Sequence, residues 1–204
     1  MTDDTVIPNH HRSYPGFSGL MGLIAALSMV FGRKGDARFA ARLGAVGPGD
    51  AVVDIGCGPG AAVRHASGLA ASVTGIDPAP IMLRVARVLT RARNVRYVDG
   101  AAEALPLPDD SATVVWSIAT VHHWRDLDDG PREMRRVLQP GGRFVAIERR
   151  TRPGATGHAS HGWTDEQADA FARHCRDHGF VDVRVEHAEP NDRRSLVAIA
   201  AKAP

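Results

Sequence analysis

The sequence has few cysteines, and they form no metal-binding or disulfide pattern. Its 204 residues include only Cys57 and Cys175, which lie far apart and lack metal-ligand spacing. This usage argues against a disulfide-stapled secreted protein, so we expect a reduced, cytoplasmic setting. Cys57 lies inside a glycine-rich turn, where a small side chain fits, and we interpret it as a packing residue rather than a nucleophile.

Lysine is also scarce, and the chain has almost no excess charge. Only Lys34 and Lys202 are lysines, arginine supplies the other basic side chains, and the formal net charge is +2. A balance this close to neutral does not indicate nucleic-acid binding, and no added basic or aromatic RNA-binding module is present. The length suits one domain with a sizeable core.

No apolar run is long enough to span a membrane comfortably. Residues 13–32 carry no charge, but glycines interrupt them, and the continuous apolar part, 20–31, is only about a dozen residues long. Its large apolar side chains recur at helical spacing. Three interpretations stay open: a helix packed on the domain, a lid over a substrate pocket, or a peripheral membrane contact through 13–34.

The most informative segment is VVDIGCGPG, Val52–Gly60, which predicts a buried strand, a glycine turn and the start of a helix. Gly56, Gly58 and Gly60 follow at a spacing of two, and glycine lets backbone N–H groups approach a ligand closely. Asp54 lies at the strand's carboxyl end, where open α/β sheets bind ligands. The pattern D-x-G-x-G-x-G differs from the dinucleotide fingerprint G-x-G-x-x-G and has no Walker lysine.

Strand-like and helix-like segments alternate along the chain, which indicates an α/β fold. We expect strands near 51–56, 72–77, 95–99, 113–119 and 143–148, and helices near 60–70, 80–92, 127–138 and 164–178. Two further strand-like runs, VDVRVEHAE and SLVAIAAKA, are joined by a polar turn at 190–194. So short a connection favours antiparallel pairing.

Four segments in order resemble the class I S-adenosylmethionine (SAM) dependent methyltransferases, in particular the broad small-molecule family (methyltransferase type 11) that includes quinone-biosynthesis C-methyltransferases. They are Val52–Gly60, SVTGID at 72–77, VRYVDGAAEALPLPDDSATVVWS at 95–117 and LQPGGRFVAIE at 138–148. Together they cover roughly half the chain. The resemblance implies a Rossmann-like, doubly wound α/β fold with a mostly parallel seven-stranded sheet and a C-terminal antiparallel hairpin. It also implies a SAM-binding domain over 36–204, preceded by an N-terminal helical or lid segment over 1–35.

The same resemblance implies SAM as cofactor and S-adenosylhomocysteine as its product. The cofactor-binding residues that it implies are Asp54, Gly56, Cys57, Gly58, Asp77, Pro78, Ala101, Ala102, Glu103 and Ser117, the last with its neighbour Ile118 as alternative. Asp77 ends the second strand, where a carboxylate accepts hydrogen bonds from both ribose hydroxyls. Ala101 stands where the family usually has an Asp that meets the adenine amino group, which weakens or moves that contact. Asp99 and the backbone N–H of Ala102 are the candidate substitutes.

Methyl transfer from a sulfonium is an in-line displacement in which proximity and orientation matter most. An acceptor can also need a base, and His122 and His123 follow the strand 113–119 at the cofactor edge of the sheet. We take them as the candidate catalytic residues, with pocket wall or packing as the competing interpretation. Glu148, which ends the strand 143–148, is a second candidate base, against the alternative of a solvated side chain.

The remaining histidines give weaker signals. His158 and His161 form a His-x-x-His pair in a glycine- and arginine-rich loop that is a candidate gate of the pocket. The pair has no third ligand in the sequence, so we expect no metal site. We expect His10 and His11 to belong to unstructured N-terminal chain.

These observations predict a SAM-dependent methyltransferase that acts on a small metabolite. Hydrophobic metabolites are among the candidate acceptors. No Asn/Asp-Pro-Pro-Tyr/Phe segment follows the strand 113–119, which argues against nucleic-acid substrates. A methyltransferase-like protein that binds SAM or its product without turnover stays open, because of Ala101 and the lack of an obvious base. A nucleotide-dependent oxidoreductase is disfavoured by the glycine spacing and by the Pro-Gly-Gly turn at 140–142.

Overall fold

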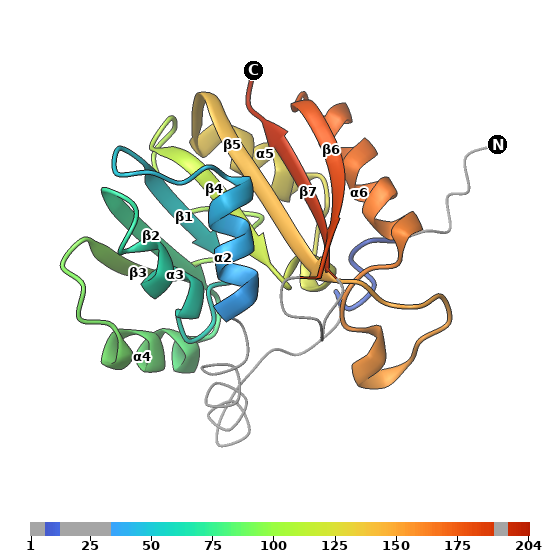
Figure 1. The fold of residues 1–204 in the computed structure, drawn as a ribbon, viewed down its shortest axis with the longest axis horizontal. Coiled ribbons are helices and arrows are strands. Elements are labelled where there is room, and N and C mark those ends of the chain that lie inside the picture. Colours follow the sequence, from blue (N-terminus) through green and yellow to red (C-terminus); the bar gives the residue numbers. More distant parts are fainter. Residues whose placement is uncertain (1–6, 13–33, 190–195) are drawn as a thin grey trace.

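The computed structural model describes residues 7–12, 34–189 and 196–204 (Figure 1). Their strands form one sheet in the order β3-β2-β1-β4-β5-β7-β6. The strands are β1 (Ala51–Ile55), β2 (Ser72–Asp77), β3 (Val95–Asp99), β4 (Ala112–Ile118), β5 (Leu138–Arg149), β6 (Val181–Ala188) and β7 (Leu196–Lys202). β1 to β5 pair in parallel, and β7 pairs antiparallel with both β5 and β6. The expected mostly parallel, seven-stranded sheet with its C-terminal antiparallel hairpin is confirmed.

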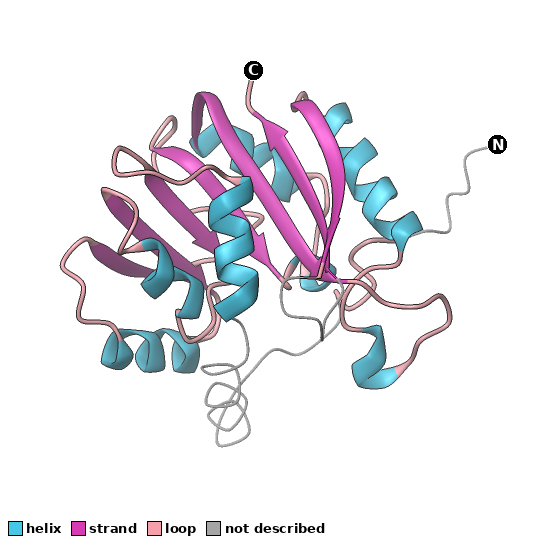
Figure 2. Ribbon diagram, in the orientation of Figure 1, coloured by secondary structure: helices cyan, strands magenta, loops and turns pink. Residues whose placement is uncertain are grey.

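Helices cover both faces of the sheet (Figure 2). They are α2 (Lys34–Leu43), α3 (Ala61–Ala66), α4 (Pro80–Leu89), α5 (Asp129–Val137) and α6 (Asp165–Asp177). One apolar layer joins Phe39 of α2 to strand residues such as Val52. The other joins Met134 of α5 and Phe171 of α6 to the opposite face, which includes Val53. Neighbouring strand residues point to opposite faces, so a strand covered on both sides reads as an unbroken apolar run.

The helices differ from expectation mainly at their ends. α3 ends at Ala66 and α4 ends at Leu89, each earlier than the apolar spacing suggests. The sequence pattern does not predict α2, because its buried side chains are mostly alanines, which give a weak apolar period. β5 begins at Leu138, earlier than expected, because the Pro-Gly-Gly turn pairs with the end of the chain. There, Gly141 N donates a hydrogen bond to Ala203 O at 3.2 Å.

Two expected elements, the apolar helix within 20–31 and the turn at 190–194, lie outside the described residues. Within the described ranges, we find no helix with the length and apolar character needed to cross a membrane.

The strand order creates a topological switch point where β1 and β4 end. β1 pairs with β2 on one side and with β4 on the other, so the connections that follow β1 and β4 leave in opposite directions. Open α/β sheets bind ligands at such a switch point, outside the carboxyl ends of the strands. Three acidic residues at or next to strand ends are buried at this edge: Asp54, Asp77 and Glu148. Buried carboxylates are costly unless they are paired, so three of them at one edge of the sheet indicate a polar site there.

At the opposite edge, Asp50 ties β1 to its neighbours. Its carboxylate accepts hydrogen bonds from Thr113 Oγ1 at 2.7 Å and from Gly47 N at 2.7 Å, and it forms an ion pair with Arg143. Burial by itself raises the pKa of Asp50. The hydrogen bonds and the charge of Arg143 outweigh burial, and they hold this pKa below its usual value.

We expect Asp50→Asn to lower the free energy of unfolding by about 1–2 kcal/mol at pH 7, because the charged acceptor is lost. The pKa of Asp50 is lower in the folded protein than in the unfolded chain. Its ionised carboxylate therefore stabilises the fold fully at pH values above the unfolded-state pKa, about 3.9. This stabilisation is lost as the pH falls through the folded-state value, so urea unfolding should show wild type and variant converging below about pH 4. A difference that does not change with pH would contradict the assignment. The exposed pair Asp182–Lys202 is the control, since Asp182→Asn should leave the free energy of unfolding nearly unchanged.

Candidate active site

The loop after β1 has a backbone that opens toward a hollow. Gly56 has φ +70° and Gly58 has φ +51°, conformations that favour glycine. The N–H groups of Gly56 and Cys57 donate to Ile76 O at 2.8 and 2.9 Å, which fixes the loop against the end of β2. A Cβ on Gly56 would lie 2.4 Å from Cγ2 of Thr120, whereas a Cβ on Gly58 would meet no atom within 4 Å. The loop is therefore tight at its first glycine and open at its second, as a ligand cradle requires.

Asp77 fastens this loop from the end of β2. Its Oδ2 accepts a hydrogen bond from Gly58 N at 2.8 Å, and its Oδ1 accepts one from Ala79 N at 2.9 Å. Burial raises the pKa of Asp77, the two backbone hydrogen bonds oppose that rise, and neighbouring Asp99 adds to it. Each carboxylate oxygen keeps further acceptor capacity, so Asp77 can also bind hydroxyl groups of a ligand.

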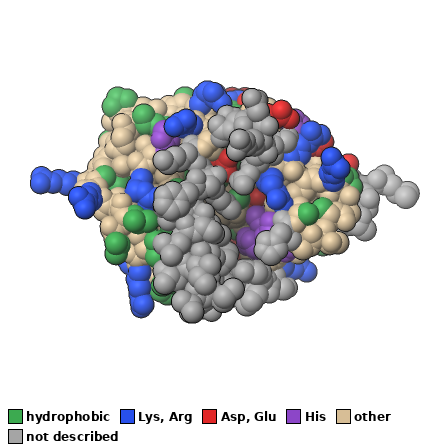
Figure 3. All heavy atoms as spheres, turned by 60° about the horizontal axis from the view of Figure 1, so that its bottom comes forward, with side chains coloured by type: hydrophobic (Ala, Val, Ile, Leu, Met, Phe, Trp, Pro, Cys, Tyr) green, Lys and Arg blue, Asp and Glu red, His purple; other side chains and the backbone are tan. Residues whose placement is uncertain are grey.

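Two adjoining hollows lie at this edge and share Gly56, Asp77, Thr120 and His123 as wall residues. The residues expected to bind the cofactor divide between them. Asp54, Gly56, Cys57, Gly58 and Asp77 line the first, and Gly56, Asp77, Pro78, Ala101, Ala102 and Glu103 line the second. Ser117 lines neither hollow, because it is fully buried and hydrogen bonds to Thr120, while its neighbour Ile118 lines the first. Figure 3 shows histidine and acidic side chains gathered at this edge.

The segment after β3 borders the second hollow. Ala101 forms an isolated bridge with Ala104 and presents no carboxylate. Glu103 Oε1 accepts a hydrogen bond from Arg125 N at 2.6 Å, so Glu103 also fastens the neighbouring loop. Asp99, the side chain considered as a substitute for the missing Asp, is exposed and lines neither hollow. The backbone of Ala102 is therefore the better placed of the two candidate substitutes.

The glycine-loop thiol does not have the properties of a nucleophile. Cys57 is 7% exposed, and burial, together with the charges of Asp54 and Asp77, raises the pKa of its thiol well above the usual value. The thiolate is the reactive form of cysteine. Cys57 thus has the environment of a packing residue.

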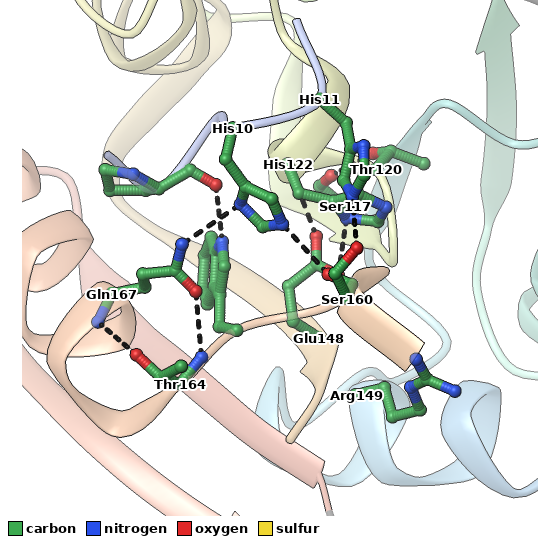
Figure 4. A network of polar contacts seen from close by, with 12 residues as sticks. His10, His11, Ser117, Thr120, His122, Glu148, Arg149, Ser160, Thr164 and Gln167 are labelled. Carbon is green, nitrogen blue, oxygen red and sulfur yellow. Dashed lines mark hydrogen bonds and ion pairs between the residues drawn. The ribbon is translucent and has the colours of Figure 1, made fainter. Parts of the chain in front are cut away.

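His122 and Glu148 form a buried pair in the wall of the first hollow. His122 lies on the short 3-10 helix η1 (Val121–His123), and Glu148 lies near the end of β5; they are 2% and 0% exposed. Nδ1 of His122 lies 2.8 Å from Oε2 of Glu148 (Figure 4). The alternative of a solvated Glu148 is wrong, because η1 folds over the end of β5. A carboxylate beside Nδ1 keeps the proton on that nitrogen, which leaves the lone pair on Nε2.

Two further imidazoles lie beside this pair. The ring centroid of His123 is 4.1 Å from that of His122, and the ring of His161 is 5.5 Å from His122 and 5.3 Å from His123. Burial and the neighbouring His122 lower the pKa of His123 to about 3, so its ring is neutral at physiological pH. All three rings line the first hollow. His161 lies in the loop after β5, and no local sequence pattern predicts where that loop packs.

Residues 7–12 pack against the site, which corrects the expectation that His10 and His11 belong to unstructured chain. His11 N donates a hydrogen bond to His122 O at 2.8 Å, which fixes the segment to η1. Nε2 of His10 lies 2.9 Å from Ser160 O (Figure 4). The partners lie more than a hundred residues away in sequence, so local patterns gave no signal for them.

The same N-terminal segment also holds the loop after β5. Nε1 of Trp163 donates to Pro8 O at 2.9 Å, and Nε2 of Gln167 donates to Ile7 O at 3.0 Å. The segment therefore joins η1, the loop that carries the short helix η2 (Gly157–Ser160), and the start of α6. His161 lies in that loop, so its position depends on these contacts.

Comparisons with known proteins identify the central part of the chain. Residues 53–146 match the family model described as "Methyltransferase domain". The uncharacterized methyltransferase YcgJ of Bacillus subtilis (strain 168) is 35% identical over 100 residues, which cover 48% of this chain and 40% of that protein. The demethylmenaquinone methyltransferase of Chlorobaculum tepidum is 38% identical over 98 residues, with the same two coverages. The chain thus spans well under half the length of these relatives.

Solved structures agree with the fold. A SAM dependent methyltransferase from Aquifex aeolicus superposes with a TM-score of 0.74 at 17% identity, covering 89% of this chain and 98% of that one. The [4+2]-cyclase SpnF gives a TM-score of 0.71 at 19% identity, covering 84% and 80%. The fold of the described residues is that of these SAM-dependent methyltransferases. Together, the domain match over residues 53–146 and the fold make this chain similar to SAM-dependent methyltransferases.

Proposed function

We propose that this protein transfers a methyl group from SAM to a small-molecule acceptor bound beside His122. The observation that carries the proposal is one hollow lined by the glycine loop and Asp77 and also by the His122–Glu148 pair. Methyl transfer needs such a neighbourhood, because the acceptor must line up behind the methyl carbon. The relatives named demethylmenaquinone methyltransferases support an acceptor that is a small molecule.

The residues present fit SAM. We place the ribose at Asp77, the methionine part along the glycine loop and the adenine in the second hollow. The open space at Gly58 and the position of Asp77 between the two hollows support this placement. Bound SAM would supply an electrophilic methyl group on its sulfonium. Because residue 101 is alanine, the adenine would be held by the backbone of Ala102 and by the shape of the hollow.

We assign His122 the task of receiving the acceptor's proton. Glu148 fixes the proton on Nδ1, and Nε2 is buried with no hydrogen-bond partner among the described residues. A positioned base contributes about 10²–10⁴-fold to a rate when the nucleophile carries a proton. Neutral His123 lies beside it and would shape the acceptor space without adding charge.

A SAM-binding protein without turnover is the second candidate, and Ala101 favours it, because this chain lacks the family's usual adenine-binding carboxylate. The fold by itself does not decide the matter, since a solved neighbour is named a [4+2]-cyclase. A methyl-transfer assay over a panel of phenols, enols and quinols separates the two candidates.

The first test is calorimetry with SAM, S-adenosylhomocysteine and NAD. We expect SAM to bind in the micromolar range, which corresponds to about −8 kcal/mol, and NAD not to bind. Asp77→Ala should weaken SAM binding about 10- to 100-fold, because hydrogen bonds to a charged acceptor are lost. Asp99→Ala is the matched control, since Asp99 ends the next strand and lines neither hollow, and it should change the affinity little. Binding of NAD instead of SAM would overturn the proposal.

We also propose a reducing, cytoplasmic setting. Cys57 and Cys175 are both free and buried, which suits a compartment where thiols stay reduced. The segment 13–34, considered for a peripheral membrane contact, lies almost wholly outside the described residues, and that contact stays a prediction from sequence.

A further inference from the structure

The three imidazoles at the hollow form a group with the dimensions of a metal site. One ring nitrogen from each of His122, His123 and His161 lies within 4.8 Å of those from the other two. A tetrahedral Zn²⁺ ion with Zn–N bonds of about 2.1 Å sets its ligand nitrogens about 3.4 Å apart. Small ring movements would close the remaining distance. His161 is half-buried and comes from a loop, so it can make such a movement.

The surroundings of His122 point independently to a ligand. Glu148 accepts the Nδ1 proton at 2.8 Å, and the Nε2 lone pair is left buried with no hydrogen-bond partner among the described residues. His122 is 2% exposed, so this atom is shielded from the bulk solvent around the protein. A buried acceptor without a partner is costly. A carboxylate behind a histidine, with the other ring nitrogen facing outward, is the arrangement that orients histidine ligands toward metal ions.

We propose that His122, His123 and His161 bind one divalent transition-metal ion of the Zn²⁺ class in the wall of the first hollow. Neutral imidazoles are the ligands that such ions prefer. The sequence suggested no metal site, because His161 had no third ligand nearby in the chain. The fold supplies the missing ligands from η1, more than thirty residues earlier in sequence.

The fourth coordination position would face the hollow. His11 stacks on His161 with centroids 4.3 Å apart, and its Nε2 lies 3.1 Å from Ser160 Oγ, so His11 covers the group on the side of the N-terminal segment. Three protein ligands with one open position are typical of catalytic rather than structural zinc sites. The ligand class that fits is an oxygen-bearing acceptor, a phenol or enol. This last step rests on the proposed methyl transfer, whereas ion binding does not.

An acceptor held by the ion would lose its hydroxyl proton when it binds the ion. Nε2 of His122 would then not receive that proton. The acceptor oxygen would then form its bond to the methyl carbon as the bond from that carbon to the SAM sulfur breaks. The released proton passes to solvent, and S-adenosylhomocysteine is the second product. With the ion bound, His122 would be a ligand, and the task of receiving the proton would belong to it only in the ion-free protein. Glu148 positions His122 in both cases.

A second group of possible ligands provides an internal control. Asp128, His174 and His178 also bring ligand atoms within 4.8 Å of one another, but Asp128 is 64% exposed at its side chain. Asp128 already pairs with both histidines, at 3.0 and 3.4 Å. This group lies apart from the hollow and resembles an ordinary surface ion pair.

The test uses the untagged 204-residue chain, dialysed against chelator and titrated with Zn²⁺ by calorimetry and with Co²⁺ by visible absorption. We expect one ion per chain and a Co²⁺ spectrum of tetrahedral intensity. His161→Ala should weaken Zn²⁺ binding at least 100-fold, and Glu148→Gln about 10- to 100-fold through loss of orientation. The double variant His174→Ala/His178→Ala should leave the affinity and the Co²⁺ spectrum unchanged.

Two results would overturn the metal site: no micromolar Zn²⁺ binding by the wild type, or binding that survives His161→Ala and disappears in the His174/His178 double variant. Thermal unfolding and SAM calorimetry on the same samples show whether each variant is folded. If the wild type binds SAM but not Zn²⁺, the metal site is disproved and the proposed function is unaffected. If it binds Zn²⁺ but not SAM, the metal site is supported and the proposed function is disproved.

Discussion

Gly56→Ala is expected to lower the free energy of unfolding by about 3 kcal/mol. The residue has φ +70°, a left-handed conformation that costs a side-chain-bearing residue about 1–2 kcal/mol. Its Cβ would also lie 2.4 Å from Cγ2 of Thr120, and overpacking of this kind costs about 1–3 kcal/mol. Urea unfolding followed by far-UV circular dichroism measures the loss. SAM binding should fall as well, because relief of the clash would displace the glycine loop.

Gly58→Ala is the matched control for this clash. Gly58 has φ +51°, also left-handed, but its added Cβ would meet no atom within 4 Å. It should therefore cost only the conformational strain, about 1–2 kcal/mol. Equal losses of stability in the two variants would show that the contact between Gly56 and Thr120 does not constrain the loop.

Glu148→Gln is expected to reduce methyl transfer about 10²- to 10³-fold with the acceptor that the panel identifies. The glutamine keeps the shape of Glu148, but its amide can donate to Nδ1 of His122 and leave the proton on Nε2. The lone pair would then point away from the acceptor, whether its task is to take a proton or to bind an ion. SAM affinity should change less than about tenfold, so steady-state kinetics should show the loss mainly in kcat.

A double-mutant cycle separates positioning from a general loss of structure. If Glu148 acts through His122, the variant Glu148→Gln/His122→Ala should be about as slow as His122→Ala alone. Glu186→Gln makes the same chemical change at an exposed ion pair with Arg184 on β6, and it should leave the rate unchanged. If the fold-losses in rate of the two single variants multiply in the double variant, Glu148 and His122 act independently, which would contradict a shared role.

The parallel sheet could be predicted because its signals are local. Val52, Val53 and Ile55 are apolar on both faces of β1, so the buried strand is visible as a run of apolar letters. The glycine turn is equally visible, because Gly56 and Gly58 occupy backbone conformations that few other residues adopt. The helix ends were less predictable, since apolar spacing continues past the residues where α3 and α4 stop.

The site beyond the glycine loop depended on contacts between distant segments. Glu148 looked like a candidate for solvent exposure because it ends a strand, and it is buried because η1 folds over that strand. His11 looked like loose N-terminal chain, yet its backbone is fixed to His122, 111 residues later in sequence. Neither fact has a local signal, since sequence spacing carries no information on which loops pack together.

By itself, the sequence determined the α/β class, the glycine loop, the strand-end Asp77 and the placement of His122 and His123 at the carboxyl edge of the parallel strands. These follow from short-range rules: apolar periodicity, glycine conformation and the position of strand ends in a parallel sheet. Only the tertiary structure decided that Glu148 is the partner of His122 and that His161 completes a group of three imidazoles. Those neighbours come from loops, and the position of a loop is set by all the surfaces on which it packs.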